Sequence, residues 1–80
     1  MENILEKIEQ LMQEIIYNDD IKITMETTLD KLYPWDDLDT VELSMALEEE
    51  YDIEFYDDEI EEFNSIERIV KIIEKKLKEK

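Results

Sequence analysis

The chain has 80 residues, of which 25 are Asp or Glu and nine are Lys or Arg, so its formal net charge is −16. Because it contains no Cys and no His, disulfides, thiolate or imidazole metal sites, and Cys or His catalytic centres are excluded. A polyanion gains no affinity by neutralising phosphates, which argues against nucleic acid and anionic membranes as partners. With 42% apolar residues, the chain should fold as one small domain whose partners are basic.

Apolar residues near the amino end recur every three or four positions, as in an amphipathic helix with one buried face. The pattern predicts a helix over residues 3–17, with Ile8, Met12 and Ile15 among its buried residues. Asn18 is expected to end this helix, because Asn tolerates the left-handed conformation. Since the sequence has no Gly, every turn should be made by Asn, Asp or Pro.

Residues 18–36 are predicted to form an ordered loop with one helical turn near residues 28–32. A purely polar connection of this length would be unusual in a compact domain, but this one carries apolar residues that can reach a core. Pro34 biases Tyr33 away from helix. The apolar residues of the loop are Ile21, Ile23, Leu29, Leu32, Tyr33 and Trp35.

A second helix is predicted over residues 37–51, with Asp36 and Asp37 as candidate N-caps. Its apolar residues form two stripes about 150° apart, and a helix at the rim of a small bundle needs only one buried face. Acidic residues edge the second stripe. The first stripe is Leu43, Ala46, Leu47 and Tyr51; the second is Leu38, Val41 and Met45, with Glu42 and Glu49 beside it.

A short helix over residues 57–63 and a last helix over residues 65–78 complete the predicted elements. Asn64 with Glu67 resembles a capping box at the start of the last helix. Residues 1–80 should therefore form a single all-α domain, a small four-helix bundle of three long helices and one short one. Fifteen acids and no basic residue lie between Lys31 and Arg68, which assigns the acidic surface to the second and third helices.

The run DDLDTVELSMALEEEY at residues 36–51, followed by DIEF and, at residues 57–59, DDE, resembles the acyl carrier proteins of bacterial fatty acid synthesis. The likeness covers nearly the whole chain. In that family the helix opens with Asp-Ser-Leu, and the Ser hydroxyl carries 4′-phosphopantetheine. Asp36, Asp37 and Leu38 stand there in this chain, so the resemblance makes Asp37 the attachment position.

An Asp cannot serve as that attachment point, because a carboxylate would form an acyl phosphate that hydrolyses readily. No cofactor is therefore expected on this chain, and Asp37 should cap the helix instead. Thr40 and Ser44 carry the nearest other hydroxyls of the helix, but neither opens it. Pro34 and Trp35 also depart from the Gly and small residue usual in the family. Asp37 is compatible with a natural loss of the serine and with an engineered block.

The resemblance implies that basic surfaces of acyl-carrier-dependent enzymes dock on the second helix. The alternative is that Leu38 and Val41 pack under the long loop and that the carboxylates form a solvated face. The implied docking residues are Asp36, Leu38, Asp39, Val41, Glu42, Met45, Glu48 and Glu49.

As a whole, the sequence predicts an acyl-carrier-like protein of fatty acid or related acyl biosynthesis that is not an enzyme. The alternative is an acidic interaction module or regulator unrelated to lipid. No Gly-containing calcium loop is present, so no metal site is expected beyond weak cation binding. No apolar run could span a bilayer and no basic leader is evident, so a cytoplasmic monomer without membrane insertion is expected.

Overall fold

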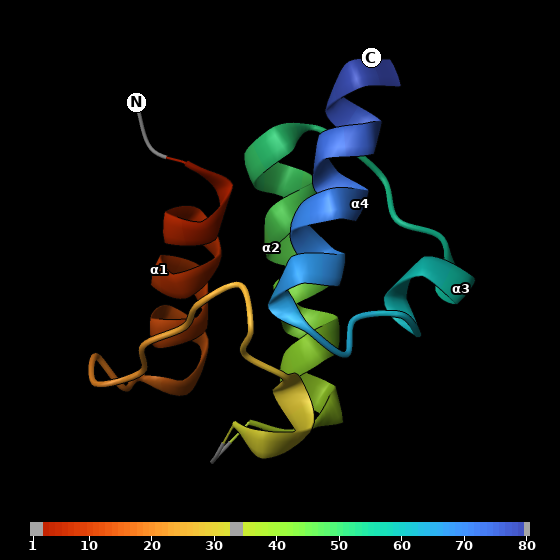
Figure 1. Ribbon diagram of the computed structural model, residues 1–80. Helices are drawn as coiled ribbons and strands as arrows, with labels where there is room; N and C mark the ends of the chain where they lie inside the picture. Colours follow the sequence, from red (N-terminus) through yellow and green to blue (C-terminus); the bar gives the residue numbers. More distant parts are fainter. Residues whose placement is uncertain (1–2, 33–34, 80) are drawn as a thin grey trace.

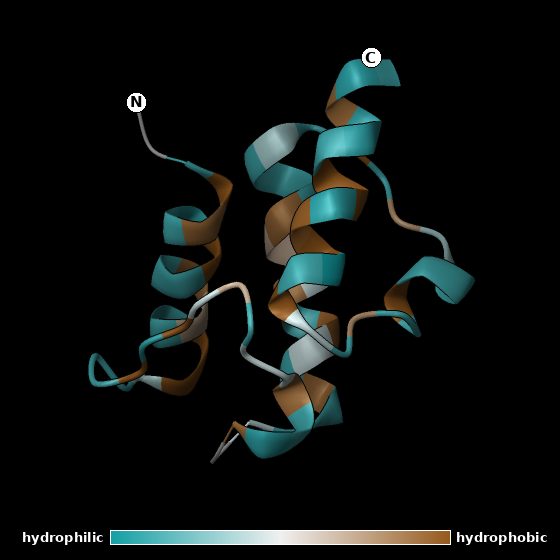
Figure 2. Ribbon diagram, in the orientation of Figure 1, coloured by the Kyte–Doolittle hydropathy of each residue, from teal (hydrophilic) through white to brown (hydrophobic). Residues whose placement is uncertain are grey.

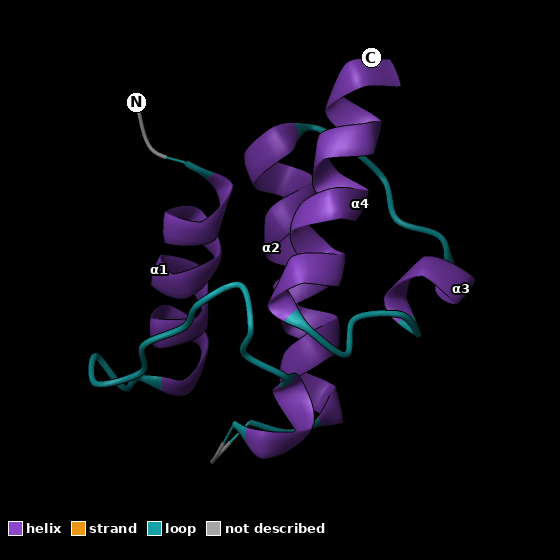
Figure 3. Cartoon of the chain, in the orientation of Figure 1, coloured by secondary structure: helices purple, strands orange, loops and turns teal. Residues whose placement is uncertain are grey.

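A computed structural model describes residues 3–32 and 35–79, which form helices joined by turns (Figures 1 and 3). In Figure 1, α2 and α4 run in the same direction, α1 runs opposite to them, and the short α3 lies at the outer edge. The all-α four-helix architecture expected from the sequence is confirmed. The elements are α1 (Ile4–Ile16), the 3-10 turn η1 (Leu29–Lys31), α2 (Asp37–Tyr51), α3 (Asp57–Ile60) and α4 (Ile66–Glu79).

The apolar faces of the three long helices meet in one core, visible as the inward brown bands of Figure 2. Each helix contributes residues spaced three or four apart, as the sequence pattern requires. The residues at 0% exposure are Ile8 and Met12 of α1, Leu43 and Leu47 of α2, and Ile66, Ile69 and Ile73 of α4.

The first half of the loop between α1 and α2 is held by two side chains of α1. Ile21 and Ile23 are buried in the core. The Gln13 side-chain amide donates to the Ile21 carbonyl at 2.9 Å, and the Ile23 N–H donates to the Glu9 carboxylate at 2.9 Å. These bonds satisfy backbone groups that the buried segment would otherwise leave unpaired.

The second half of the loop is fixed to the start of α4 by backbone hydrogen bonds. The Leu29 N–H donates to the Asn64 carbonyl at 3.0 Å, and the Ile66 N–H donates to the Thr27 carbonyl at 2.9 Å. Leu29 is buried, and the expected helical turn near residues 28–32 is confirmed as η1. Trp35 is also buried, whereas the predictions for Tyr33 and Pro34 lie outside the described residues.

The first helix ends differently from the prediction. Tyr17, rather than Asn18, adopts the left-handed conformation, with φ 54° and ψ 44°. Asn18 instead accepts the Asp20 N–H through Oδ1 at 2.9 Å. Asp52, after α2, is the other described residue of this kind, with φ 55°. The left-handed conformation costs a residue with a Cβ about 1 kcal/mol or more. The backbone of Tyr17 is therefore strained.

The N-cap of α2 is Asp36, and the prediction that Asp37 caps the helix is wrong. The Asp39 N–H donates to Asp36 Oδ1 at 3.1 Å, and the Asp36 N–H donates to Asp39 Oδ2 at 3.1 Å. This reciprocal capping box satisfies two backbone donors at the helix start. Asp37 is therefore the first residue inside the helix, and its side chain has no capping role.

Two further boundaries differ from the prediction. Ser65, not Asn64, caps α4, because its Oγ accepts the Arg68 N–H at 3.2 Å. The short helix was expected to reach residue 63 but ends at Ile60. The next residues form a tighter turn, in which the Phe63 N–H donates to the Ile60 carbonyl. Phe63 is buried, and its ring contacts the Phe55 ring edge-on at a centroid distance of 5.1 Å. The long helices otherwise lie within one residue of their predicted bounds.

Candidate functional site

The start of α2 presents the Asp37 carboxylate to solvent. Asp37 is exposed, and it forms no ion pair within the described parts of the chain. Because Asp36 caps α2, the Asp37 carboxylate is not used for capping. This position offers a negative charge and no hydroxyl.

The two neighbouring hydroxyls of α2 are both engaged within the fold. Thr40 Oγ1 accepts a 2.9 Å hydrogen bond from Trp35 Nε1 and donates to the Asp36 carbonyl at 3.4 Å. Ser44 is 1% exposed, and its Oγ donates to the Val41 carbonyl at 2.7 Å. The Ser44 hydroxyl is therefore shielded from solvent, and the Thr40 hydroxyl is engaged in two hydrogen bonds within the chain.

The second apolar stripe of α2 lies on the surface, not beneath the loop. Leu38 is 76% exposed, Met45 54% and Val41 46%. Glu42 and Glu49 beside the stripe are also exposed. The second stripe is therefore an exposed apolar surface edged by carboxylates.

Three of the expected docking residues are bonded to the backbone of this chain. Asp36 and Asp39 form the capping box of α2. Glu48 is half-buried, and its carboxylate accepts the Phe55 N–H at 2.8 Å, which anchors the segment between α2 and α3. The remaining docking candidates are exposed.

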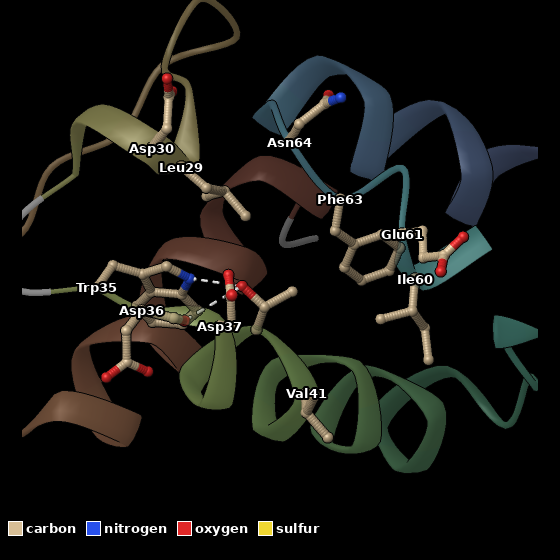
Figure 4. Close-up of a pocket in the computed structure, with 11 residues that line it drawn as sticks. Leu29, Asp30, Trp35, Asp36, Asp37, Val41, Ile60, Glu61, Phe63 and Asn64 are labelled. Carbon is tan, nitrogen blue, oxygen red and sulfur yellow. Dashed lines mark hydrogen bonds between the residues drawn. The ribbon is translucent and has the colours of Figure 1, made fainter. Parts of the chain in front are cut away.

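A cavity of about 460 Å³ lies beside Asp37, between η1, the first turns of α2 and the segment after α3 (Figure 4). Its apolar lining comes from Leu29, Trp35, Val41, Ile60 and Phe63. The sequence did not predict this cavity, which is lined by residues far apart in the chain, such as Leu29 of η1 and Phe63 after α3. The hydrogen bond between Trp35 and Thr40, five residues apart, was likewise not predicted.

The far edge of α3 is tied to the end of α4 by an ion pair between Lys76 Nζ and Glu59 Oε1 at 2.8 Å. Burial raises the pKa of Glu59, but the hydrogen bond to Lys76, the Tyr56 N–H and the nearby positive charges outweigh it, so that its pKa lies below the ordinary 4.5. Lys76 Nζ also lies 4.9 Å from the centroid of the Tyr56 ring. This cluster is structural and lies apart from the cavity.

No helix in the described ranges is both long and apolar enough to cross a bilayer. Within the same residues, no three or more carboxylates are grouped closely enough to hold a metal ion.

The sequence of this chain matches a known protein family. A family model described as "Phosphopantetheine attachment site" matches residues 6–73. The acyl carrier protein of Buchnera aphidicola subsp. Acyrthosiphon pisum (strain Tuc7) is 42% identical, over 95% of this chain and 95% of its own. The family uses a 4′-phosphopantetheine prosthetic group, and its acyl carrier proteins are carriers that interact with partner enzymes.

Two solved structures share the fold. The holo acyl carrier protein from Geobacter metallireducens superimposes with a TM-score of 0.82 at 25% identity, covering 94% of this chain and 86% of that chain. The acyl carrier protein from Thermotoga maritima gives a TM-score of 0.81 at 27% identity, covering 91% and 85%. The helical arrangement expected from the sequence is confirmed by both.

Proposed function

Because this chain belongs to the acyl carrier protein family, we propose that it docks on carrier-dependent enzymes without carrying an acyl group covalently. The observation that carries this proposal is the pairing of an exposed apolar stripe on α2 with a carboxylate, rather than a hydroxyl, at position 37. The exposed stripe supports docking on a partner enzyme. The carboxylate opposes attachment of 4′-phosphopantetheine.

The residues at the start of α2 do not fit a 4′-phosphopantetheine group. A stable phosphodiester needs an alcohol, and Asp37 offers only a carboxylate, whose phosphate anhydride would hydrolyse. The Thr40 hydroxyl is held between the Trp35 indole and the Asp36 carbonyl, and the Ser44 hydroxyl is buried. Neither of these two α2 hydroxyls is thus positioned to replace the missing serine.

Mass spectrometry after incubation with coenzyme A and a broad phosphopantetheinyl transferase tests this step. The native chain should keep its mass, whereas Asp37→Ser should gain one pantetheine arm if the transferase recognises α2. A Ser44→Ala change in the native background serves as the matched control for modification elsewhere. A stable mass gain on the native chain would overturn the proposal.

Docking is supported by the exposure of Leu38, Val41 and Met45 and by the carboxylates beside them. The negative charge of these carboxylates would speed the association of a basic partner. Added salt would screen this attraction and weaken the complex. The apolar side chains would supply the short-range contact on which specificity depends.

Surface plasmon resonance against carrier-dependent enzymes, such as a transferase and a ketosynthase, tests docking directly. Met45→Glu should weaken binding about tenfold or more by placing a charge in the apolar stripe, and Glu42→Lys by a few-fold. Glu74→Lys, the same charge change on exposed α4, is the matched control and should leave binding within about twofold. Equal losses for Glu42→Lys and Glu74→Lys would contradict a docking role for α2.

An acidic interaction module unrelated to lipid is the second candidate, supported by the run of 15 acids from Asp36 to Glu67 without a basic residue. Binding to basic proteins that do not use carriers, with none to carrier-dependent enzymes, would favour it. A monomeric state and a cytoplasmic location stay predictions, and light scattering and cell fractionation check them. Catalysis is not part of either proposal.

A further inference from the structure

We propose that the thioether of Met45 is a reversible oxidation site, at which a hydroperoxide weakens the docking of α2 on its partner enzymes. This inference rests on the proposed docking function and adds a means of regulating it. The residues that support it are the methionines of the chain and the neighbours of Met45 in the second apolar stripe.

The methionine thioethers are the only sulfur atoms of this chain, because the sequence has four Met and no Cys. No thiol therefore competes with them for a hydroperoxide. The single tryptophan, Trp35, is buried, and its indole N–H is bonded to Thr40. A two-electron oxidant should thus react first at a methionine.

The methionines differ widely in their exposure to solvent. Met45 is 54% exposed and Met25, in a turn of the long loop, is 37% exposed. Met12 lies in the core at 0% exposure. Because oxidation follows exposure, Met12 should be protected, and Met45 should be the most reactive methionine of the described residues.

The neighbours of Met45 on α2 make its oxidation consequential. Leu38 and Val41 continue the exposed apolar stripe on the same side of the helix. Glu42 and Glu49, also exposed, lie three positions before Met45 and four positions after it. Their charge disfavours the approach of anionic oxidants, whereas a hydroperoxide is neutral and meets no such repulsion.

The reaction transfers one oxygen atom from the hydroperoxide to sulfur. The thioether sulfur attacks the terminal peroxide oxygen, an S–O bond forms as the O–O bond breaks, and the proton of the transferred oxygen passes to the leaving oxygen. Met45 becomes the sulfoxide, oxidised by two electrons, and the hydroperoxide is reduced to an alcohol, or to water when it is hydrogen peroxide. Sulfoxide reductases that use a thiol reductant reverse the change.

Oxidation of Met45 alters the surface without altering the core. The sulfoxide places a polar oxygen within the apolar stripe, and a partner that covers the stripe must bury this oxygen. The same oxygen adds partial negative charge beside Glu42 and Glu49 but offers a partner no donor. Since more than half of the Met45 side chain is exposed in the free chain, the fold should be kept while docking weakens.

Hydrogen peroxide treatment followed by peptide mapping in a mass spectrometer tests the site. Met45 should be oxidised a few times faster than Met25, and Met12 should remain reduced. After the peroxide is removed, surface plasmon resonance against an untreated ketosynthase should show affinity about tenfold lower than that of the reduced chain. Treatment with reductases for both sulfoxide epimers should restore the affinity.

Met45→Leu removes the reactive sulfur, and the quantity compared is its affinity before and after peroxide. Whatever its starting affinity, that ratio should stay within about twofold. Met25→Leu is the matched control, since Met25 lies outside α2, and it should keep the roughly tenfold loss on oxidation. Circular dichroism melts of the oxidised chains measure whether the helices are kept.

Four results would overturn the proposal while leaving docking intact. They are undiminished affinity of the oxidised chain, equal losses on oxidation for the native chain and Met45→Leu, faster oxidation of Met25 than of Met45, and a loss of helical signal that accounts for the loss of binding. Absence of binding by the reduced native chain would instead overturn the docking function, and its regulation with it.

Discussion

The indole Nε1 of Trp35 donates a 2.9 Å hydrogen bond to the hydroxyl of Thr40. The bond joins the last part of the long loop to the first turn of α2. Because Trp35 is only 8% exposed, its N–H has little access to water if Thr40 is lost. Asp37 lies between these two residues in sequence.

Replacing Thr40 with Val should therefore destabilise the fold. The change keeps the shape of the side chain but leaves the buried indole N–H unpaired, at a cost of about 1 to 2 kcal/mol. Chemical denaturation followed by Trp35 fluorescence measures the loss. Thr40→Ser retains the hydroxyl and should recover most of the free energy of unfolding. Equal stability of the Val and Ser variants would show that the bond contributes nothing.

The ion pair between Lys76 and Glu59 should make the fold less stable as pH falls into the acid range. The folded pKa of Glu59 lies below its ordinary value of 4.5, so the carboxylate stabilises the fold above that pH. This contribution is lost as pH falls below 4.5 and through the folded pKa. Glu59→Gln should thus cost about 1 to 2 kcal/mol near neutral pH and progressively less in acid.

The matched control for that experiment is Glu61→Gln, an exposed residue two positions on that forms no ion pair in the described ranges. The difference between native chain and Glu61→Gln in free energy of unfolding should stay nearly constant across the same pH range. A Glu59→Gln deficit that does not shrink below pH 4.5 would contradict the role assigned to the carboxylate.

Because the backbone of Tyr17 is left-handed, replacing Tyr17 with Gly should stabilise the fold. Tyr17 is 95% exposed, so its side chain contributes little packing to set against its backbone strain. Tyr17→Gly should raise the free energy of unfolding by roughly 0.5 to 1 kcal/mol, a few degrees in melting temperature. Glu14→Gly, within α1, is the control and should lower stability by about 1 kcal/mol. Failure of Tyr17→Gly to raise the melting temperature would show that the strain is compensated.

Salt should stabilise this chain. Fifteen acids without a basic neighbour in sequence lie between Asp36 and Glu67, and screening reduces their mutual repulsion. The melting temperature should rise by several degrees between low and physiological ionic strength. Asp58→Lys with Glu61→Lys should have a smaller salt response. A flat response in the native chain would contradict repulsion as a cost to folding.

The parts of the fold that local pattern determines could be predicted from the sequence. The long helices follow from apolar spacing, and η1 follows from the apolar residues that hold the loop. The cavity could not be predicted, because Leu29 and Phe63 come together only through a turn whose position local propensity does not define. Tyr17 was missed for a related reason: the chain must turn there for Ile21 to reach the core, whatever residue stands at that position.

The two backbone hydrogen bonds between Thr27, Leu29, Asn64 and Ile66 have a mechanical consequence. They close a ring of chain that contains the whole of α2 and α3. A partner that pulls on the outer face of α2 therefore pulls on a segment whose two ends, residues 27–29 and residues 64–66, are bonded to each other. The amide protons of Leu29 and Ile66 should accordingly exchange with solvent only when the entire domain unfolds.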